Sequence, residues 1–325
     1  MKYIAEELKK FSHQIKFAVE NYTNHGVKQK DFDNALIGGL GGSGIAGRMI
    51  KNYFNDKLDF PIEVVSDYSL PKYIGSRSLV ILSSYSGNTE ETIAMYHDAK
   101  QRGCKIVVLT TGGQLLKLAQ ADGILYYLAE AASQPRMALG YPFTYLFLLF
   151  FEFLGQEKKA DFLQISSRVA HNDDYINRSA DLFKTFAHTV KNKFVIICDP
   201  VFEGIAIRFA QQIQENAKHE AFVSVIPESN HNVIETYYND THSNFVFLNS
   251  GFNKRTGLRF AFLKDLLKKH NGVIEEIHIT DQSIATIFDT IFLLDWLSLQ
   301  IADSLHAVSN TVPNIMELKG FLSNK

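Results

Sequence analysis

The sequence has few cysteines and little excess of charge of either sign. Two cysteines occur in 325 residues, Cys104 and Cys198, each beside an apolar run typical of a strand. A disulfide framework is therefore excluded, and we expect buried free thiols in a reducing compartment. The formal net charge of −2 gives no reason to expect a nucleic-acid partner.

We also expect no signal peptide and no membrane span. Residues 1–8 are charged and amphipathic and contain no apolar core of a signal peptide. The most apolar stretch, residues 141–154, is too short for a bilayer span and predicts a buried helix. These features predict a cytoplasmic protein without membrane contact. The length and a hydrophobic content of 46% suit two domains with sizeable cores.

Short apolar runs alternate with helical patterns along the whole chain. Such alternation predicts mainly parallel sheets with helices on both faces. The pattern recurs with an offset of about one domain length, so we expect two related α/β domains, residues 1–154 and 155–325. The predicted strands are 35–39, 62–65, 79–82, 105–109 and 124–128 in the first half, and 193–199, 220–225, 244–249 and 273–279 in the second.

Two turns in the first half carry glycines and hydroxyls where predicted strands end. Residues 39–44 read GLGGSG, with a helix expected from about Ile45, and residues 84–89 read SYSGNT. Hydroxyls and free N–H groups at a helix N-terminus favour an anion such as a phosphate monoester. A simpler interpretation of the second turn is a helix cap at Thr89 without a ligand. The candidate phosphate-binding residues are Gly41, Gly42, Ser43, Ser84, Ser86 and Thr89.

The corresponding turns of the second half lack these residues, so we expect the first domain to bind the phosphate. The two turns resemble the sugar isomerase (SIS) domain. Further motifs resemble the bifunctional phosphoglucose/phosphomannose isomerases, and they follow the family's order from residue 39 to residue 319. These motifs are PRMALGY at 135–141, ENAK at 215–218, PESNHN at 227–232 and ELK at 317–319.

This resemblance implies a fold and an activity. The fold would be two tandem SIS domains, each a flavodoxin-like α/β/α sandwich with a mainly parallel sheet, in a homodimer without metal or cofactor. The activity would be ring opening and cis-enediol proton transfer between glucose 6-phosphate, or mannose 6-phosphate, and fructose 6-phosphate. Near the C1–C2 end of the sugar the family places a residue that affects tolerance of the mannose epimer. Thr311 is the candidate here, and the epimer preference stays open.

The resemblance also implies roles for four side chains. Glu215 would move the proton between C2 and C1, which suits a partly buried carboxylate. His231 would assist ring opening in the site of the partner subunit, and Lys319 would be the second ring-opening group or a cationic donor. Arg136 would stabilise charge on the enediolate oxygen. Without the resemblance, the simpler interpretations are a solvated helix carboxylate, a loop histidine, a helix-end lysine and a surface guanidinium.

Two other functions fit part of this pattern. A non-catalytic sugar-phosphate sensor would keep the hydroxyl-rich turns and would not need Glu215, His231 and Lys319. An isomerase of another aldose phosphate would keep all of them and would differ around residues 308–314. The presence of all three side chains favours an enzyme over a sensor.

Overall fold

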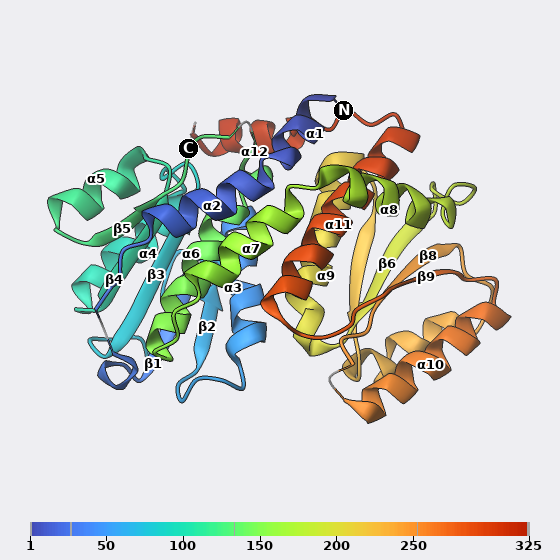
Figure 1. The fold of residues 1–325 in the computed structure, drawn as a ribbon, viewed down its shortest axis with the longest axis horizontal. Coiled ribbons are helices and arrows are strands. Elements are labelled where there is room, and N and C mark those ends of the chain that lie inside the picture. Colours follow the sequence, from blue (N-terminus) through green and yellow to red (C-terminus); the bar gives the residue numbers. More distant parts are fainter. Residues whose placement is uncertain (1, 27, 133, 252, 324–325) are drawn as a thin grey trace. The chain divides into compact units, whose positions relative to one another are not determined.

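The computed structural model describes residues 2–26, 28–132, 134–251 and 253–323, and its contacts group the chain into two compact units (Figure 1). The N-terminal unit is Lys9–Ala170, and the C-terminal unit is His171–Lys325 with Met1–Leu8. Residues 155–170 lie with the N-terminal unit because α7 (Lys159–Val169) packs on α2 (Phe11–Asn21). The domain boundary after residue 154 stays a prediction.

The N-terminal unit contains a five-stranded parallel sheet in the order β2-β1-β3-β4-β5. This is the flavodoxin-like order, in which strand order reverses next to β1. Because parallel crossovers are right-handed, α3 lies on one face of the sheet and α4 and α5 lie on the other. The elements are β1 (Asn34–Gly38), α3 (Gly41–Phe54), β2 (Ile62–Val65), β3 (Ser78–Ser84), α4 (Glu90–Gln101), β4 (Lys105–Thr110), α5 (Gly113–Ala121), β5 (Leu125–Leu128) and α6 (Gly140–Phe153).

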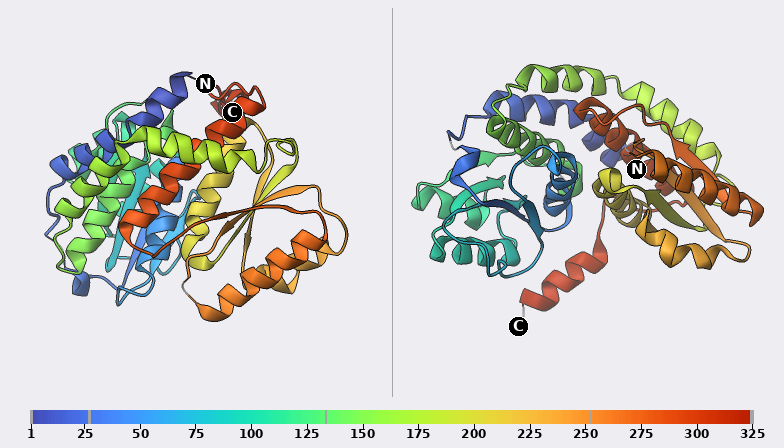
Figure 2. Two further views of the ribbon diagram at one scale, coloured as in Figure 1. Left: turned by 45° about the vertical axis from the view of Figure 1, so that its right-hand side comes forward. Right: turned by 90° about the horizontal axis from the view of Figure 1, so that it is seen from below.

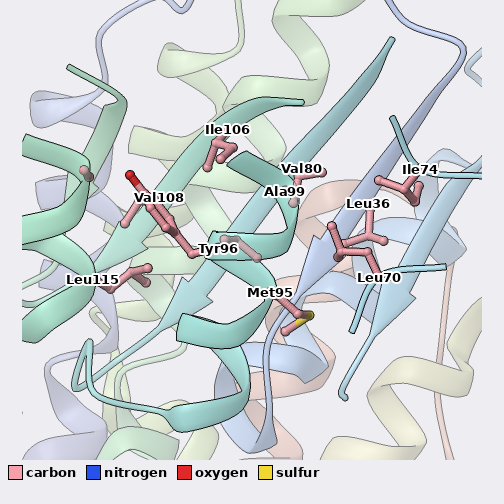
Figure 3. Close-up of a cluster of buried hydrophobic side chains, with 12 residues drawn as sticks. Leu36, Leu70, Ile74, Val80, Met95, Tyr96, Ala99, Ile106, Val108 and Leu115 are labelled. Carbon is pink, nitrogen blue, oxygen red and sulfur yellow. The ribbon is translucent and has the colours of Figure 1, made fainter. Parts of the chain in front are cut away.

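Alternate residues of the strands build the core between the sheet and α4. Figure 3 shows Val80 of β3 with Ile106 and Val108 of β4, which turn to the face where Met95 and Tyr96 of α4 pack. Successive side chains of a strand point to opposite faces, so each run of apolar residues serves two cores. All five side chains are at most 4% exposed.

Helix α6 confirms the buried helix predicted at residues 141–154. Every residue of α6 except Pro142 and Glu152 is buried. The helix packs against α3 and α2. Aromatic rings fill this interface, and Phe147 lies 5.0 Å from Tyr53 of α3 between ring centroids. The apolar run at residues 141–154 therefore forms a core helix of the N-terminal unit.

The C-terminal unit repeats this plan with a four-stranded parallel sheet in the order β7-β6-β8-β9. The order matches the first four strands of the N-terminal sheet, so the predicted recurrence of the α/β pattern is confirmed. Its elements are α8 (Asn172–Lys184), β6 (Lys193–Cys198), α9 (Glu203–Gln212), η4 (Ile213–Ala217), β7 (Ala221–Val225), β8 (Ser243–Leu248), α10 (Lys254–Lys269), β9 (Val273–Ile277), α11 (Ile284–Ser304) and α12 (Pro313–Ser323).

Helix α11 has the length and hydropathy of a membrane span, and it is the one helix with both properties in the part of the chain that the structure describes. Of its most apolar window, 78% is buried inside the protein. It packs on α8, α9 and η4 of its own unit. The burial identifies α11 as a core helix of this unit.

The expected start of the helix after β1 is wrong by four residues, because α3 begins at Gly41 rather than near Ile45. The carbonyl of Leu40 accepts hydrogen bonds from the N–H groups of Ser43 and Gly44, at 3.1 and 3.3 Å. Gly41 enters the helix with φ +54°, which a residue with a Cβ adopts at a cost. The shorter elements are α1 (Lys2–Lys9), η1 (Gln29–Asp31), η2 (Pro135–Met137), η3 (Pro200–Phe202), η5 (Glu228–His231) and η6 (Val233–Tyr237).

Candidate active site

The two hydroxyl-rich turns of the N-terminal unit meet at the carboxyl ends of β1 and β3. The Ser43 hydroxyl accepts a hydrogen bond of 3.3 Å from the backbone N–H of Tyr85. A Cβ on Gly39 would lie only 2.7 Å from the Ser83 carbonyl oxygen, so glycine is needed for this approach. β1 and β3 are hydrogen-bonded neighbours, and Gly38 is in register with Leu82. The fold therefore joins motifs that lie about 40 residues apart.

The N-termini of α3 and α4 point to the same edge of the sheet. Thr89 occupies the N-cap position of α4, but within the described residues its side chain makes no capping bond. Its hydroxyl lies 2.8 Å from the Ser84 hydroxyl instead. Leu40, at the N-cap of α3, has no polar side chain to offer. The simple cap interpretation of Thr89 is therefore wrong, and the first N–H groups of both helices face an edge without a capping side chain.

Arg136 and Ser86 lie at the border of these turns. A Cβ on Gly42 would lie 3.5 Å from the Arg136 Cα, which places η2 against the first turn of α3. The Arg136 side chain is 5% exposed and donates to the Gln134 Oε1 at 3.0 Å, so the surface-guanidinium interpretation is wrong. Ser86 is exposed, and its hydroxyl accepts from the Asn88 N–H at 3.2 Å.

A small pocket opens beside these turns, between the strand ends and the start of α6. Its lining is partly polar and partly aromatic. The lining residues are Gly42, Ser43, Ser83, Tyr85, Leu109, Thr110, Tyr127, Ala129, Pro135, Ala138, Leu139, Pro142 and Tyr145.

The C-terminal unit fills the equivalent edge with its own carboxylate. Asp199 follows β6, is 1% exposed, and accepts from the Ser250 N–H at 2.8 Å and from the Val201 N–H at 3.1 Å. Ser250 follows β8, so Asp199 joins the same pair of turns that Ser43 joins in the N-terminal unit. A buried carboxylate at this edge repels a phosphate. This geometry supports placing the phosphate in the N-terminal unit.

Glu215 lies in a π-helical turn, η4, that continues α9. The residue is half-buried, and Gln214 beside it donates to the Ala221 carbonyl at the start of β7, at 2.7 Å. The turn ends at Lys218, whose backbone is left-handed with φ 54°. π-Turns inside helices are rare and are enriched at functional sites.

His231 and Lys319 lie in exposed elements of the same unit. His231 ends η5, beyond the carboxyl end of β7, whereas Glu215 precedes the amino end of β7. Lys319 belongs to α12, the helix that leads to the C-terminal end in Figure 2. The described side chains of α12 are all exposed. Since a strand residue spans about 3.3 Å, the length of β7 separates Glu215 from His231 by on the order of 15 Å.

Tyr85 and Asp199 were not among the candidate site residues, although each carries a weak signal in the sequence. The amide of Tyr85 lies within a motif, but its contact with Ser43 depends on the sheet. Asp199 ends a predicted strand, and comparing the two halves at this position could have singled it out. Among the described residues, no group of three or more His, Cys, Asp or Glu could hold a metal ion.

Comparisons with known proteins cover both units. Residues 30–154 match the model of the SIS domain, and residues 180–322 match the bacterial phospho-glucose isomerase C-terminal SIS domain. Solved structures with the same fold include tagatose-6-phosphate ketose/aldose isomerase from Escherichia coli, with a TM-score of 0.71, 16% identity and 95% of each chain covered. Glucosamine-6-phosphate deaminase from Thermotoga maritima has a TM-score of 0.73 at 16% identity, covering 96% of this chain and 97% of that one.

Curated relatives are closer in sequence. A D-glucosamine-6-phosphate 4-epimerase of Sulfolobus acidocaldarius is 34% identical over 209 residues, 64% of this chain and 65% of the relative. A bifunctional phosphoglucose/phosphomannose isomerase of Thermoplasma acidophilum is 28% identical over 328 residues, 98% of this chain and 97% of the relative. Another, of Caldicellulosiruptor bescii, is 37% identical over 312 residues and 91% of each chain. With this coverage and both SIS domains present, the chain belongs to the bifunctional phosphoglucose/phosphomannose isomerase family.

Proposed function

We propose that this protein is an aldose–ketose isomerase that interconverts glucose 6-phosphate, and mannose 6-phosphate, with fructose 6-phosphate. The observation that carries the proposal is the junction of the two hydroxyl-rich turns through Ser43 and Tyr85. This junction brings neutral donors and two helix N-termini together at one edge of the sheet. The chain also belongs to a family that is named for this activity.

The phosphate is bound without a formal cation in either turn. The first N–H groups of α3, from Gly41 and Gly42, and the hydroxyls of Ser43, Ser84 and Thr89 are the donors. Ser86 adds an exposed hydroxyl at the rim. Helix polarity at both N-termini supplies the favourable potential for the dianion.

Glu215 is the base in the proton transfer. Its carboxylate takes the proton from C2 of the open-chain aldose, which leaves a cis-enediol, and returns the proton to C1 to give the ketose. Arg136 stabilises the negative charge that develops on the enediolate oxygen. The half-buried setting of Glu215 limits competition from water.

His231 and Lys319 act in ring opening, and His231 acts in the site of a partner subunit. The separation of Glu215 and His231 along β7 supports this sharing, since the carbon chain of a hexose phosphate is shorter than that separation. The exposed apolar side chains near the C-terminus support a homodimer, since a second copy would cover them. They are Val308, Ile315, Met316, Leu318, Phe321 and Leu322.

The proposals for location, cofactors and epimer tolerance follow the family resemblance. The protein acts in the cytoplasm, which the free thiols of Cys104 and Cys198 support. The cis-enediol route uses proton transfers to and from side chains, so we expect it to proceed without a metal or cofactor. Thr311 is the candidate for tolerance of the mannose epimer.

A coupled assay with the purified protein tests the activity. Glucose 6-phosphate, mannose 6-phosphate and glucosamine 6-phosphate are offered side by side, the last because one relative is named as its 4-epimerase. Formation of fructose 6-phosphate from the first two sugars supports the proposal. Binding of fructose 6-phosphate without turnover would instead identify a sensor. Turnover of another aldose phosphate, without turnover of the first two sugars, would show that the proposed substrate is wrong.

A further inference from the structure

Side-chain hydrogen bonds from Lys218 and Ser309 hold the backbone of the turn that carries Glu215. The turn is π-helical from Ile213 to Ala217 and ends at Lys218, which has φ 54°. A non-glycine residue in the left-handed region is uncommon and costs energy, so surrounding contacts must maintain it. The proposed base therefore lies on a backbone with two irregular features in succession.

The first contact that holds the turn comes from Lys218 itself. Its ammonium donates to the Thr311 carbonyl at 2.7 Å and also to the Glu215 carbonyl. Thr311 belongs to the segment between α11 and α12, residues 305–312, which we call the strap. The Lys218 side chain therefore links the backbone of Glu215 to the strap, although its own surface is exposed.

The second contact is buried and comes from the strap. Ser309 is 1% exposed, and its hydroxyl donates to the Asn216 carbonyl at 2.9 Å. The Asn216 amide in turn donates to the Ser298 hydroxyl of α11 at 2.9 Å. The backbone carbonyl of Asn216 is thus bonded by the strap, and its side chain is bonded by α11.

A buried ion pair anchors the helix just before the turn. The Arg208 guanidinium donates to Asp295 at 2.5 Å, and Gln212 donates to the other carboxylate oxygen at 3.0 Å. Both charged side chains are at most 4% exposed. α9 is therefore fixed to α11 up to Gln212, the residue before the π-turn.

We propose that Lys218 and Ser309 are positioning residues for the proton transfer, which hold the π-turn against the strap and thereby aim the Glu215 carboxylate. The inference rests on the proposed function of Glu215 as the base. If the turn relaxed to α-helical geometry, the residues after it would rotate by about 100° around the helix axis. The strap continues into α12, which carries Lys319.

The effect on catalysis is expected to exceed the effect on stability. Lys218 is exposed and bonds two carbonyls, so its loss removes little buried structure. A displacement of about 1 Å in a reacting group can lower a rate by about a hundredfold. Loss of either contact should therefore change kcat much more than the melting temperature.

The test uses Lys218→Met and Ser309→Ala in the full-length protein, with matched controls. Lys264→Met removes a lysine that pairs with Glu276 at 2.6 Å, and Ser179→Ala removes a buried hydroxyl that donates to the Ile176 carbonyl at 2.8 Å. Steady-state rates are measured with glucose 6-phosphate and with its C2-deuterated form, together with melting temperatures.

We expect kcat to fall about ten- to a hundredfold in both variants, with KM changed less than about twofold. The deuterium isotope effect on kcat should rise, because proton transfer becomes the slower step, and Lys218→Arg should recover part of kcat. The controls should keep the parent kcat and isotope effect. If Ser309→Ala does not fold, the exposed Lys218 variants still give the answer.

Two results would overturn the inference while the proposed function stands. One is an unchanged kcat in Lys218→Met when the parent enzyme isomerises glucose 6-phosphate. The other is a lower kcat with an unchanged isotope effect and a melting temperature reduced in proportion, which is the signature of a structural role only. A parent protein without isomerase activity would instead refute the proposed function.

Discussion

The hydroxyl of Thr89 lies 2.8 Å from that of Ser84, although Thr89 occupies the N-cap position of α4. A threonine at this position ordinarily turns its oxygen to the N–H groups of the first turn. Here the two hydroxyls bond each other at the end of β3, where Ser84 is only 1% exposed. The same sheet edge holds Ser43, which ties the first glycine-rich turn to Tyr85.

The role of Ser43 can be tested with Ser43→Ala. The variant loses one hydroxyl donor and the bond to Tyr85, so we expect KM for fructose 6-phosphate to rise about three- to tenfold, as for the loss of about 1 kcal/mol of hydrogen bonding. The kcat should change less. Ser167→Ala, which removes an exposed hydroxyl on α7 bonded to Leu163, is the control. An unchanged KM would remove Ser43 from the phosphate site.

The base is tested with Glu215→Gln, which keeps the shape of the side chain. We expect kcat to fall by about 10²- to 10⁴-fold while fructose 6-phosphate still binds, because the amide cannot accept the C2 proton. Exchange of solvent deuterium into the sugar carbon, followed by NMR, should stop. Glu220→Gln, an exposed carboxylate of the same unit, should behave like the parent. Exchange near the parent rate in Glu215→Gln would exclude Glu215 as the base.

Sharing of the site between subunits predicts complementation. Glu215→Gln and His231→Ala chains, each inactive alone, are unfolded together and refolded to give mixed dimers. A mixed dimer in which His231 crosses the interface contains one site with both residues intact, so we expect about a quarter of the parent activity in a random mixture. Mixed dimers verified by mass spectrometry that stay inactive would show that each chain supplies its own His231.

A buried histidine predicts a dependence of stability on pH. The His25 ring is 1% exposed, and its Nε2 lies 3.0 Å from the Leu149 carbonyl and 3.4 Å from the Glu152 carboxylate. Burial lowers the pKa of His25 below its usual value of 6.5, and this outweighs the opposite effects of the hydrogen bond to the Leu149 carbonyl and of the Glu152 charge. As the pH falls below 6.5, the unfolded chain binds a proton that the folded chain does not, so stability decreases.

This decrease can reach about 1.4 kcal/mol per pH unit between the two pKa values. Urea unfolding at pH 7, 6 and 5 should show this decrease in the free energy of unfolding for the parent, and a smaller decrease for His25→Gln. His97→Gln, an exposed histidine of the same unit, should keep the parent slope. An NMR titration that places the pKa of His25 at or above 6.5 would contradict the prediction.

Periodicity and turn chemistry were sufficient to predict the parallel sheets and the buried helix at residues 141–154. These features depend on local patterns, since a strand buried on both faces reads as a short apolar run. The expected start of α3 lies four residues too late, because glycines disfavour helices in isolation. In the structure, Gly41 and Gly42 enter the helix, since the Leu40 carbonyl receives the N–H groups of the residues that follow.

The amino-acid sequence by itself determined the α/β class, the repeated plan and the residue types available for phosphate binding and proton transfer, because these follow from periodicity and side-chain chemistry. Only the tertiary structure decided that Ser43 bonds Tyr85, that Asp199 occupies the equivalent edge of the second sheet, and that Lys218 and Ser309 hold the turn of Glu215. Each of these contacts joins residues 42 to 93 positions apart. Such pairs have no common local pattern, and their distance depends on the order of the strands and the packing of the helices.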